Sequence, residues 1–421
     1  MGDLMAGVVR GTLRGAGRRG GAGPRRGGTR AWQVGLAVGA LAGIAGRYVG
    51  RRADLIARRG LVDWERAEQI AVSRLAHAPG ALAASELRAA QPSYARAMDR
   101  VVPLLERSLG SPLPGVVERH EVVDRAGWAR ANLVTFRHLI GRIEEHLVVR
   151  RGTHEPGLAP GLTALANRIV STQQVGLLLG FLGNRVLGQY DVALLSAEAP
   201  PGRLLFVEEN IRATATALDV PLEDFRTWIC LHETTHAYEL EAHPWLRPYL
   251  AERIERQLSG FLGEVRTWRL ESLVRAVRHS RRSGEPLLAG MLPDEQRRSL
   301  REMQAIMSVM EGFSDWVMDD VGGELLPDVP GMRKRFEARR DRRRRGIDRI
   351  VARLTGLDMK LEQYRRGERF VAGIVEVGGR TALARLWDGP ASMPSDAELA
   401  DPAAWVRRVC PETAVVGARS A

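Results

Sequence analysis

The chain has 421 residues, 45% of them hydrophobic and 27% charged, which excludes a disordered, collagen-like or coiled-coil protein. Its two cysteines, Cys230 and Cys410, exclude a disulfide-rich secreted scaffold and any four-cysteine metal site. The net charge of +12 lies almost entirely in residues 1–60, and the remaining 361 residues carry only +2. The body of the protein therefore has no charge excess that would indicate a nucleic-acid partner, and we expect none.

The first 60 residues divide into two segments of different composition. Residues 1–30 are rich in Gly and Arg and almost free of large apolar side chains, so we expect a disordered tail. Residues 31–60 begin with an uncharged stretch, 31–46, in which Gln33 is the only polar side chain, and continue into a basic flank. We interpret residues 31–60 as a separate apolar, glycine-rich segment.

The uncharged stretch 31–46 has three interpretations. Its 16 residues fall just short of the roughly 17 that a membrane span needs, so one interpretation is membrane association through residues 31–50. Gly35, Gly39 and Gly43 fall at four-residue spacing, which would allow close helix contact in such a membrane segment. The alternatives are a Gly/Ala helix packed on the protein body and translated upstream sequence without a function. Two cysteines fit a reducing compartment, so we expect a cytoplasmic protein, whether free or attached to a membrane.

The body, residues 61–410, has the sequence pattern of a mainly α (α+β) fold. Amphipathic spacing, interrupted by Pro79-Gly80 and by a Pro-rich loop at 111–115, predicts helices over residues 63–75, 83–109, 124–147 and 162–187. Short apolar runs at 192–195 and 204–207 are the best strand candidates. We divide the body into 61–200 (helical), 201–330 (with the motif described next) and 331–410 (C-terminal, helical), followed by a tail at 411–421.

Residues 232–236 have the sequence His-Glu-Thr-Thr-His. Positions i and i+4 of a helix lie on one face, so the imidazoles of His232 and His236 can converge on one metal ion. Glu233 lies beside them, where it can take a proton from water. The motif therefore predicts a helix that carries a zinc site, provided that a third ligand is found elsewhere in the chain.

The residues before the motif support this helix. Asp219-Val220-Pro221 offers a start signal, because proline suits the first turn of a helix. Phe225 and Ile229 then precede His232 and His236 at helical spacing. The face that packs inward is thus the face that would hold the metal.

Glu311 is the best candidate for the third ligand of a catalytic zinc ion, which keeps its fourth position open for water. It is a carboxylate on an otherwise apolar helical face, where a charge is costly unless it is paired or binds a metal. Asp315, one turn later, is predicted to accept a hydrogen bond from the far nitrogen of a ligand histidine. His243 precedes Pro244, and we expect a loop histidine there. The alternative is that Glu311 and Asp315 pair with a buried arginine.

Together these residues resemble a known family. The downstream Glu-x-x-Ser-Asp resembles the gluzincin pattern of thermolysin-like metallopeptidases. More narrowly, the chain resembles an uncharacterised bacterial family of zincin-like metallopeptidases that is often labelled as associated with deazaflavin coenzyme biosynthesis. The blocks that carry this resemblance, spread over residues 61–410, are Val122–Trp128, Gly188–Asp191, Pro244–Arg247, Glu311–Asp315, Gly356–Lys360 and Gln363–Arg365.

The resemblance implies a largely helical zincin fold, with a small sheet beside the zinc helix, and hydrolase activity. By this reading His232, His236 and Glu311 hold Zn²⁺, while Glu233 removes a proton as water attacks a carbonyl that the zinc polarises. By analogy with zincins, the strand at 204–207 would present an edge to an extended peptide, so we expect a peptide or protein substrate. The candidate oxyanion donors are Tyr364, Tyr190, Tyr238 and Arg247.

A second class of function stays open at this point, namely a non-catalytic zinc-binding scaffold or interaction protein. The presence of Glu233 favours catalysis, because a structural zinc site normally has four protein ligands. The sequence contains no phosphate-binding loop before Lys-Ser or Lys-Thr and no dinucleotide-binding fingerprint in a strand–helix context, so we expect zinc as the cofactor and no organic one.

Overall fold

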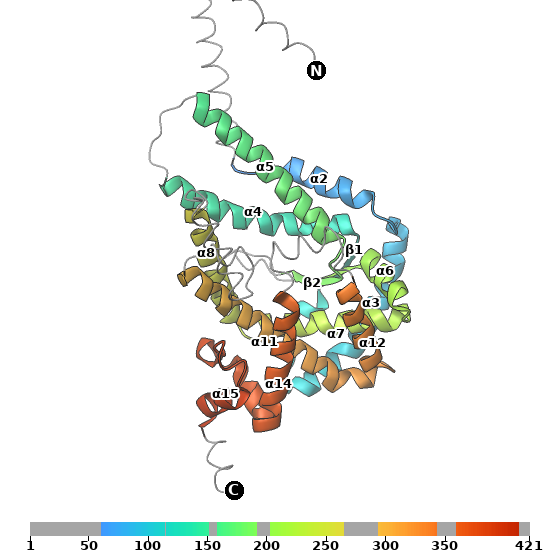
Figure 1. The fold of residues 1–421 in the computed structure, drawn as a ribbon. Helices are drawn as coiled ribbons and strands as arrows, with labels where there is room; N and C mark the ends of the chain where they lie inside the picture. The colour runs from blue at the N-terminus through green and yellow to red at the C-terminus, as the bar shows by residue number, and fades with distance from the viewer. Residues whose placement is uncertain are drawn as a thin grey trace, which may run out of the picture.

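The computed structural model describes residues 60–113, 115–150, 158–191, 203–264, 294–342 and 359–411. These residues form helices around one three-stranded sheet, which confirms the mainly α fold class (Figure 1). The predicted tails, the apolar segment 31–46 and the predicted strand at 192–195 lie outside the described residues. The division of the body at residues 200 and 330 stays a prediction.

Four helices of the N-terminal half lie close to where the sequence pattern predicts them. Asp63 begins the first by accepting a hydrogen bond from the backbone N–H of Arg66 at 3.2 Å. The second continues through Pro92, and its buried residues from Ala90 to Leu105 pack along one face. Their bounds are α2 (Trp64–Ala76), α3 (Ala84–Leu109), α4 (Arg125–Arg150) and α5 (Leu158–Gly183).

The C-terminal half of the described chain is also helical. Asp219 has a left-handed φ of 54° and ends the helix before the motif, so the motif helix starts after Pro221. The described helices here are α6 (Glu208–Leu218), α7 (Leu222–Glu241), α8 (Leu246–Glu264), α11 (Asp294–Leu325), α12 (Val329–Arg342), α14 (Met359–Ala384) and α15 (Pro402–Val409). Among the described residues, no helix combines the length and hydropathy needed to cross a membrane.

The sheet has the strand order β1-β3-β2, with β1 at His120–Val123, β2 at Gly188–Asp191 and β3 at Arg203–Val207. β1 runs parallel to β3, with His120 opposite Leu204, and β2 runs antiparallel to β3, with Gly188 opposite Phe206. The predicted strand at 204–207 exists, but the expectation that it presents an edge is wrong, because both of its edges are paired. Among the described strands, β1 and β2 form the edges.

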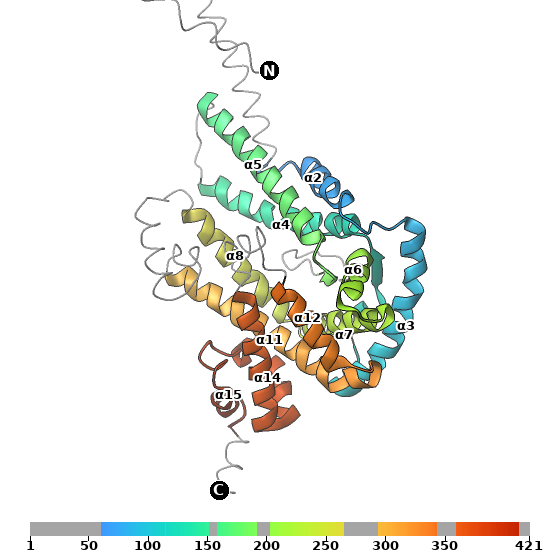
Figure 2. The ribbon, with the colours of Figure 1, turned by 45° about the vertical axis from the view of Figure 1, so that its right-hand side comes forward.

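The sheet separates two hydrophobic cores, because successive side chains of β3 point to opposite faces. Leu204 and Phe206 join the larger core, with helices α3, α7, α11 and α14. Leu205 and Val207 join the smaller core, with α2, α4 and α5. Both views of the ribbon show these two groups of helices on opposite sides of the sheet (Figures 1 and 2).

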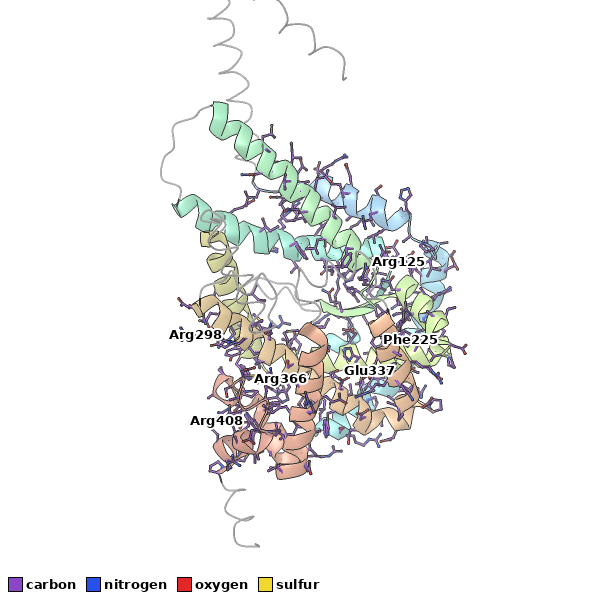
Figure 3. All side chains as sticks on the ribbon, viewed as in Figure 1. Arg125, Phe225, Arg298, Glu337, Arg366 and Arg408 are labelled. Carbon is purple, nitrogen blue, oxygen red and sulfur yellow. The ribbon has the colours of Figure 1, made fainter. Side chains whose placement is uncertain are left out.

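A buried polar network fixes the N-terminal half of α7. The guanidinium of Arg226 pairs with the fully buried carboxylate of Glu208 on α6, which also accepts a hydrogen bond from the hydroxyl of Tyr94 at 2.6 Å. Phe225, next to Arg226, is fully buried in the larger core, and Figure 3 labels it in this part of the molecule. Because each buried charge has a partner, the network holds α7 in one position against α3 and α6.

Candidate metal centre

His232 and His236 lie one turn apart on α7, as the spacing of the motif predicts. Their Nε2 atoms are 3.3 Å apart, and the two rings meet edge to face with centroids 4.6 Å apart. Phe225 and Ile229, on the preceding turns of the same helix, are buried in the larger core. The apolar stripe thus directs both imidazoles toward the interior of the protein.

Helix α11 brings Glu311 to the same point. Its Oε2 lies 3.9 Å from the Nε2 of His232 and 3.9 Å from the Nε2 of His236. The ligand atoms that the three residues offer all lie within 4.8 Å of one another. Each of the three side chains is partly exposed, so one side of the cluster stays open.

The donor set and its spacing fit a zinc ion. Two imidazole nitrogens and one carboxylate oxygen are a set that catalytic zinc sites use. Four ligands about 2.1 Å from a tetrahedral ion stand about 3.4 Å from one another. The observed separations of 3.3 Å and 3.9 Å are close to that value.

The far nitrogens of the two histidines bond to Glu239 and Ser314, and this corrects the predicted role of Asp315. The Nδ1 of His236 lies 2.7 Å from the Oε2 of Glu239, and the Nδ1 of His232 lies 3.0 Å from the Oγ of Ser314. An imidazole that binds a metal through Nε2 carries its proton on Nδ1, so both residues are placed to accept from it. These two bonds fix the direction of both rings.

Asp315 pairs with Arg333 of α12. The guanidinium of Arg333 lies 3.6 Å from the Oδ1 of Asp315 and donates to its backbone carbonyl at 2.9 Å. Burial raises the pKa of the Asp315 carboxyl to about 7, although the charge of Arg333 acts to lower it. The pairing with an arginine, which was the alternative interpretation, is therefore observed for Asp315, whereas Glu311 faces the histidines.

The charges around the cluster favour a cation. Although burial acts to lower the pKa of His236, the carboxylates of Glu239, Glu311 and Glu233 raise it to about 10. Burial raises the pKa of Glu239 to about 7, although His236 acts to lower it. Glu239 is fully buried, and its Oε1 has no hydrogen-bond partner among the described residues. Because buried carboxylates require positive charge nearby, they favour a metal ion as well as a proton.

Glu233 lies beside the cluster and contacts strand β2. Burial raises the pKa of its carboxyl to about 7, while His236 and a hydrogen bond from the backbone N–H of Tyr190 act to lower it. A Cβ atom at Gly188 would stand only 2.6 Å from the Cγ of Glu233, so only glycine lets the strand approach this closely. A buried carboxyl with a pKa near neutral can accept and return a proton.

The four candidate oxyanion donors differ in where the structure places them. The hydroxyl of Tyr190 accepts a hydrogen bond from Arg247 at 2.7 Å, and both side chains bond to Glu241. Tyr238 lies two residues beyond His236, about 200° around the helix, and packs against His243. Tyr364 belongs to α14, but its side chain is outside the described residues. Tyr190 and Arg247 are thus brought together, and Tyr238 points elsewhere.

His243 follows the end of α7, as predicted, and lies outside the cluster. Its Nδ1 is 2.9 Å from the backbone oxygen of Glu239, and its ring stacks on Trp387 with centroids 5.0 Å apart. Sequence reasoning missed Glu239, Ser314 and Gly188. Glu239 could have been found as an acidic residue three positions after His236, on the same helix face. For Ser314 and Gly188 the sequence offered only their place in the blocks that carry the family resemblance, without a stated role.

Two of three comparisons with known proteins found a match. The family described as zincin-like metallopeptidase matches residues 62–406. A crystal structure of a proposed hydrolase with a novel fold, from Chloroflexus aurantiacus, is 36% identical in sequence and superposes with a TM-score of 0.60, covering 82% of this chain and 98% of that one. A comparison with curated proteins found no match. The family match spans nearly all of the described residues and includes His232, His236 and Glu311, so the chain belongs to the zincin-like metallopeptidase family.

Proposed function

We propose that this protein is a zinc-dependent peptidase that cleaves peptide or amide bonds. His232, His236 and Glu311 hold the zinc ion, and Glu233 is the general base. The observation that carries the proposal is the convergence of these three ligand atoms, from two helices, beside a buried carboxyl whose pKa is about 7. A purely structural zinc site would have a fourth protein ligand, and the described residues contribute three.

Zinc, when bound, supplies Lewis acidity that polarises a carbonyl group and makes a water molecule more acidic. Glu233 takes the proton from the attacking water and returns it to the leaving amine, which its pKa near neutral allows. Glu239 and Ser314 hold the imidazoles in the direction that ligation requires. The Tyr190–Arg247 pair is the better placed of the candidate oxyanion donors, because the backbone of Tyr190 already bonds to Glu233.

Strand β2 supports a peptide as the substrate. One edge of β2 pairs with β3, and the backbone N–H of Tyr190 points from the other edge to Glu233. An extended peptide that adds to the remaining backbone groups of this edge would bring its carbonyl groups past the cluster. The strand that offers an edge in this proposal is therefore β2, in place of the paired strand β3.

The test is a Glu233→Gln variant of the full chain, with Glu252→Gln on α8 as the control because Glu252 is an exposed carboxylate on another helix. We expect both variants to keep zinc, measured by plasma mass spectrometry. Hydrolysis of a synthetic peptide library, followed by mass spectrometry, falls at least about 100-fold in Glu233→Gln only. Wild-type activity in Glu233→Gln would remove this residue from the mechanism, and a zinc-loaded wild-type protein without hydrolysis would favour the scaffold function.

A further inference from the structure

A pocket lies between helices α8 and α11 and the segment of chain that precedes α15. Its volume is about 770 Å³, and its wall consists of residues from α8, α11, the segment 393–398 and α15. Figure 3 labels Arg298 of α11 and Arg408 of α15 on this side of the molecule. The volume lies within the range that small-molecule sites occupy. We call this feature the α8–α11 pocket.

The α8–α11 pocket is separate from the metal centre. Glu302, which lines the pocket, is nine residues before Glu311 on α11. Nine residues make two and a half helical turns, so these two side chains leave opposite faces of α11, about 13.5 Å apart along its axis. The lining residues also include neither Glu239 nor Ser314, which bond to the histidines.

Two of the acidic side chains that line the pocket already have arginine partners. Arg408 donates to the carboxylate of Glu398 at 2.6 Å. Arg366 of α14 donates to the carboxylate of Asp396 at 3.0 Å. These ion pairs hold the segment 393–398 as one wall of the pocket, and they neutralise both carboxylates.

Arg253 of α8 offers the pocket a buried donor. Its guanidinium lies 3.3 Å from the ring centroid of Tyr249 and donates to the backbone oxygen of that residue at 3.2 Å. Its Nε atom is buried and has no hydrogen-bond partner among the described residues. The Oε2 of Glu302 lies 3.7 Å from this Nε, beyond hydrogen-bond distance. A buried donor without a partner favours an acceptor from a ligand.

Arg298 and Arg301 add positive charge at the same pocket. They lie three residues apart on α11, and both are exposed lining residues. Neither has an ion-pair partner among the residues that the structure describes. Like charges at this helical spacing repel each other, and an anion between them would remove the repulsion. The planar guanidinium group suits carboxylate and phosphate, because it can donate two parallel hydrogen bonds to either.

The rest of the wall is largely apolar. Ala305 and Ile306 of α11 are buried, as are Met393 and Pro394 on the facing segment. The ring of Tyr249 adds an aromatic surface. A ligand that fills the pocket would therefore contact arginines at one part of the wall and apolar side chains at another.

We propose that the α8–α11 pocket binds a small organic anion. Its carboxylate or phosphate group lies against Arg253, Arg298 and Arg301, and its apolar body lies against Ile306 and Met393. The site is distinct from the metal centre, and the inference is independent of the proposed peptidase function.

Isothermal titration calorimetry of the full chain tests the proposal, with octanoate and octyl phosphate as the probes. The test variant is R298Q/R301Q. The control is R88Q/R107Q, which removes the same charge from exposed positions of α3. We expect at least one probe to bind the wild type and the control with the same Kd, and R298Q/R301Q with a Kd at least about tenfold higher. All four side chains are exposed, so thermal unfolding should change little.

Three further probes test the two parts of the ligand. Acetate and inorganic phosphate lack the apolar body, and octylammonium carries the opposite charge, so we expect all three to bind at least about tenfold more weakly. The tighter of octanoate and octyl phosphate identifies the preferred head group. An equal Kd in R298Q/R301Q and the wild type would overturn the proposal, because the anion would then bind elsewhere, as at the metal centre. No binding of either eight-carbon anion, or equally tight binding of octylammonium, would also overturn it.

Discussion

The two helix pairs α2–α5 and α7–α11 meet in different ways. The α2–α5 contact is made by glycines and apolar side chains, and the polar groups near it bond to the backbone or to exposed partners. The α7–α11 contact encloses two histidines and several buried or half-buried carboxylates. The first contact is mainly apolar, whereas the second gathers like charges that a cation would stabilise. We therefore expect α2–α5 to contribute mainly to stability and α7–α11 mainly to metal binding and catalysis.

The largest expected effect is the loss of zinc. A ligand that binds only the folded state adds about 4 kcal/mol when its free concentration exceeds Kd by about 1,000-fold. Treatment with a chelator should therefore lower the unfolding temperature and speed hydrogen exchange in α7 and α11, while α2 and α5 stay protected. Equal loss of protection in both helix pairs would contradict the distinction between them.

A Gly176→Val substitution addresses the other helix pair. Because a Cβ atom at Gly176 would stand 2.8 Å from the backbone oxygen of Ala67, α2 and α5 must separate. We expect the free energy of unfolding to fall by about 3 kcal/mol, measured by urea titration, with the zinc content unchanged. Gly141, where a Cβ atom would meet nothing within 4 Å, provides the matched control as Gly141→Val. Loss of zinc in Gly176→Val would show that the two pairs depend on each other.

A Glu239→Gln substitution has the smallest expected effect. Its amide oxygen still accepts from the Nδ1 of His236, but the negative charge is lost. We expect zinc affinity to fall by about tenfold in competition with a chromogenic chelator, while the zinc-free protein becomes no less stable. Glu223→Gln, which removes an exposed carboxylate from the same helix, should bind zinc as the wild type does. An unchanged zinc affinity in Glu239→Gln would show that the charge of Glu239 does not contribute to zinc binding.

The helices and the metal cluster could be predicted because local spacing determines them. The i, i+4 histidines and a carboxylate on an apolar face are visible in the sequence, and the structure brings His232, His236 and Glu311 together. The sheet could not be predicted in the same way. β1 and β2 have four residues each, and their residues pair with β3 partners that are 84 positions away for β1 and 12 to 18 positions away for β2. The central position of β3 therefore follows only from tertiary structure.

Asp315 shows the same limit within the site. Its position four residues after Glu311 made it a reasonable partner for a histidine, but the direction of its side chain depends on Arg333 of another helix. Glu239 takes that role from within α7, three residues after His236. Asp315 has Arg333 as a partner, whereas Glu239 has the imidazole of His236. The spacing of these residues in the sequence does not predict that difference.

The most direct test of the central claim is the zinc content of the freshly purified full chain beside a Glu311→Ala variant. Glu324→Ala, an exposed carboxylate on the same helix α11, is the matched control. The account predicts about one zinc per chain in the wild type and in Glu324→Ala, and little or none in Glu311→Ala. No zinc in the wild type, with none taken up on titration, or an undiminished zinc content in Glu311→Ala, would contradict it.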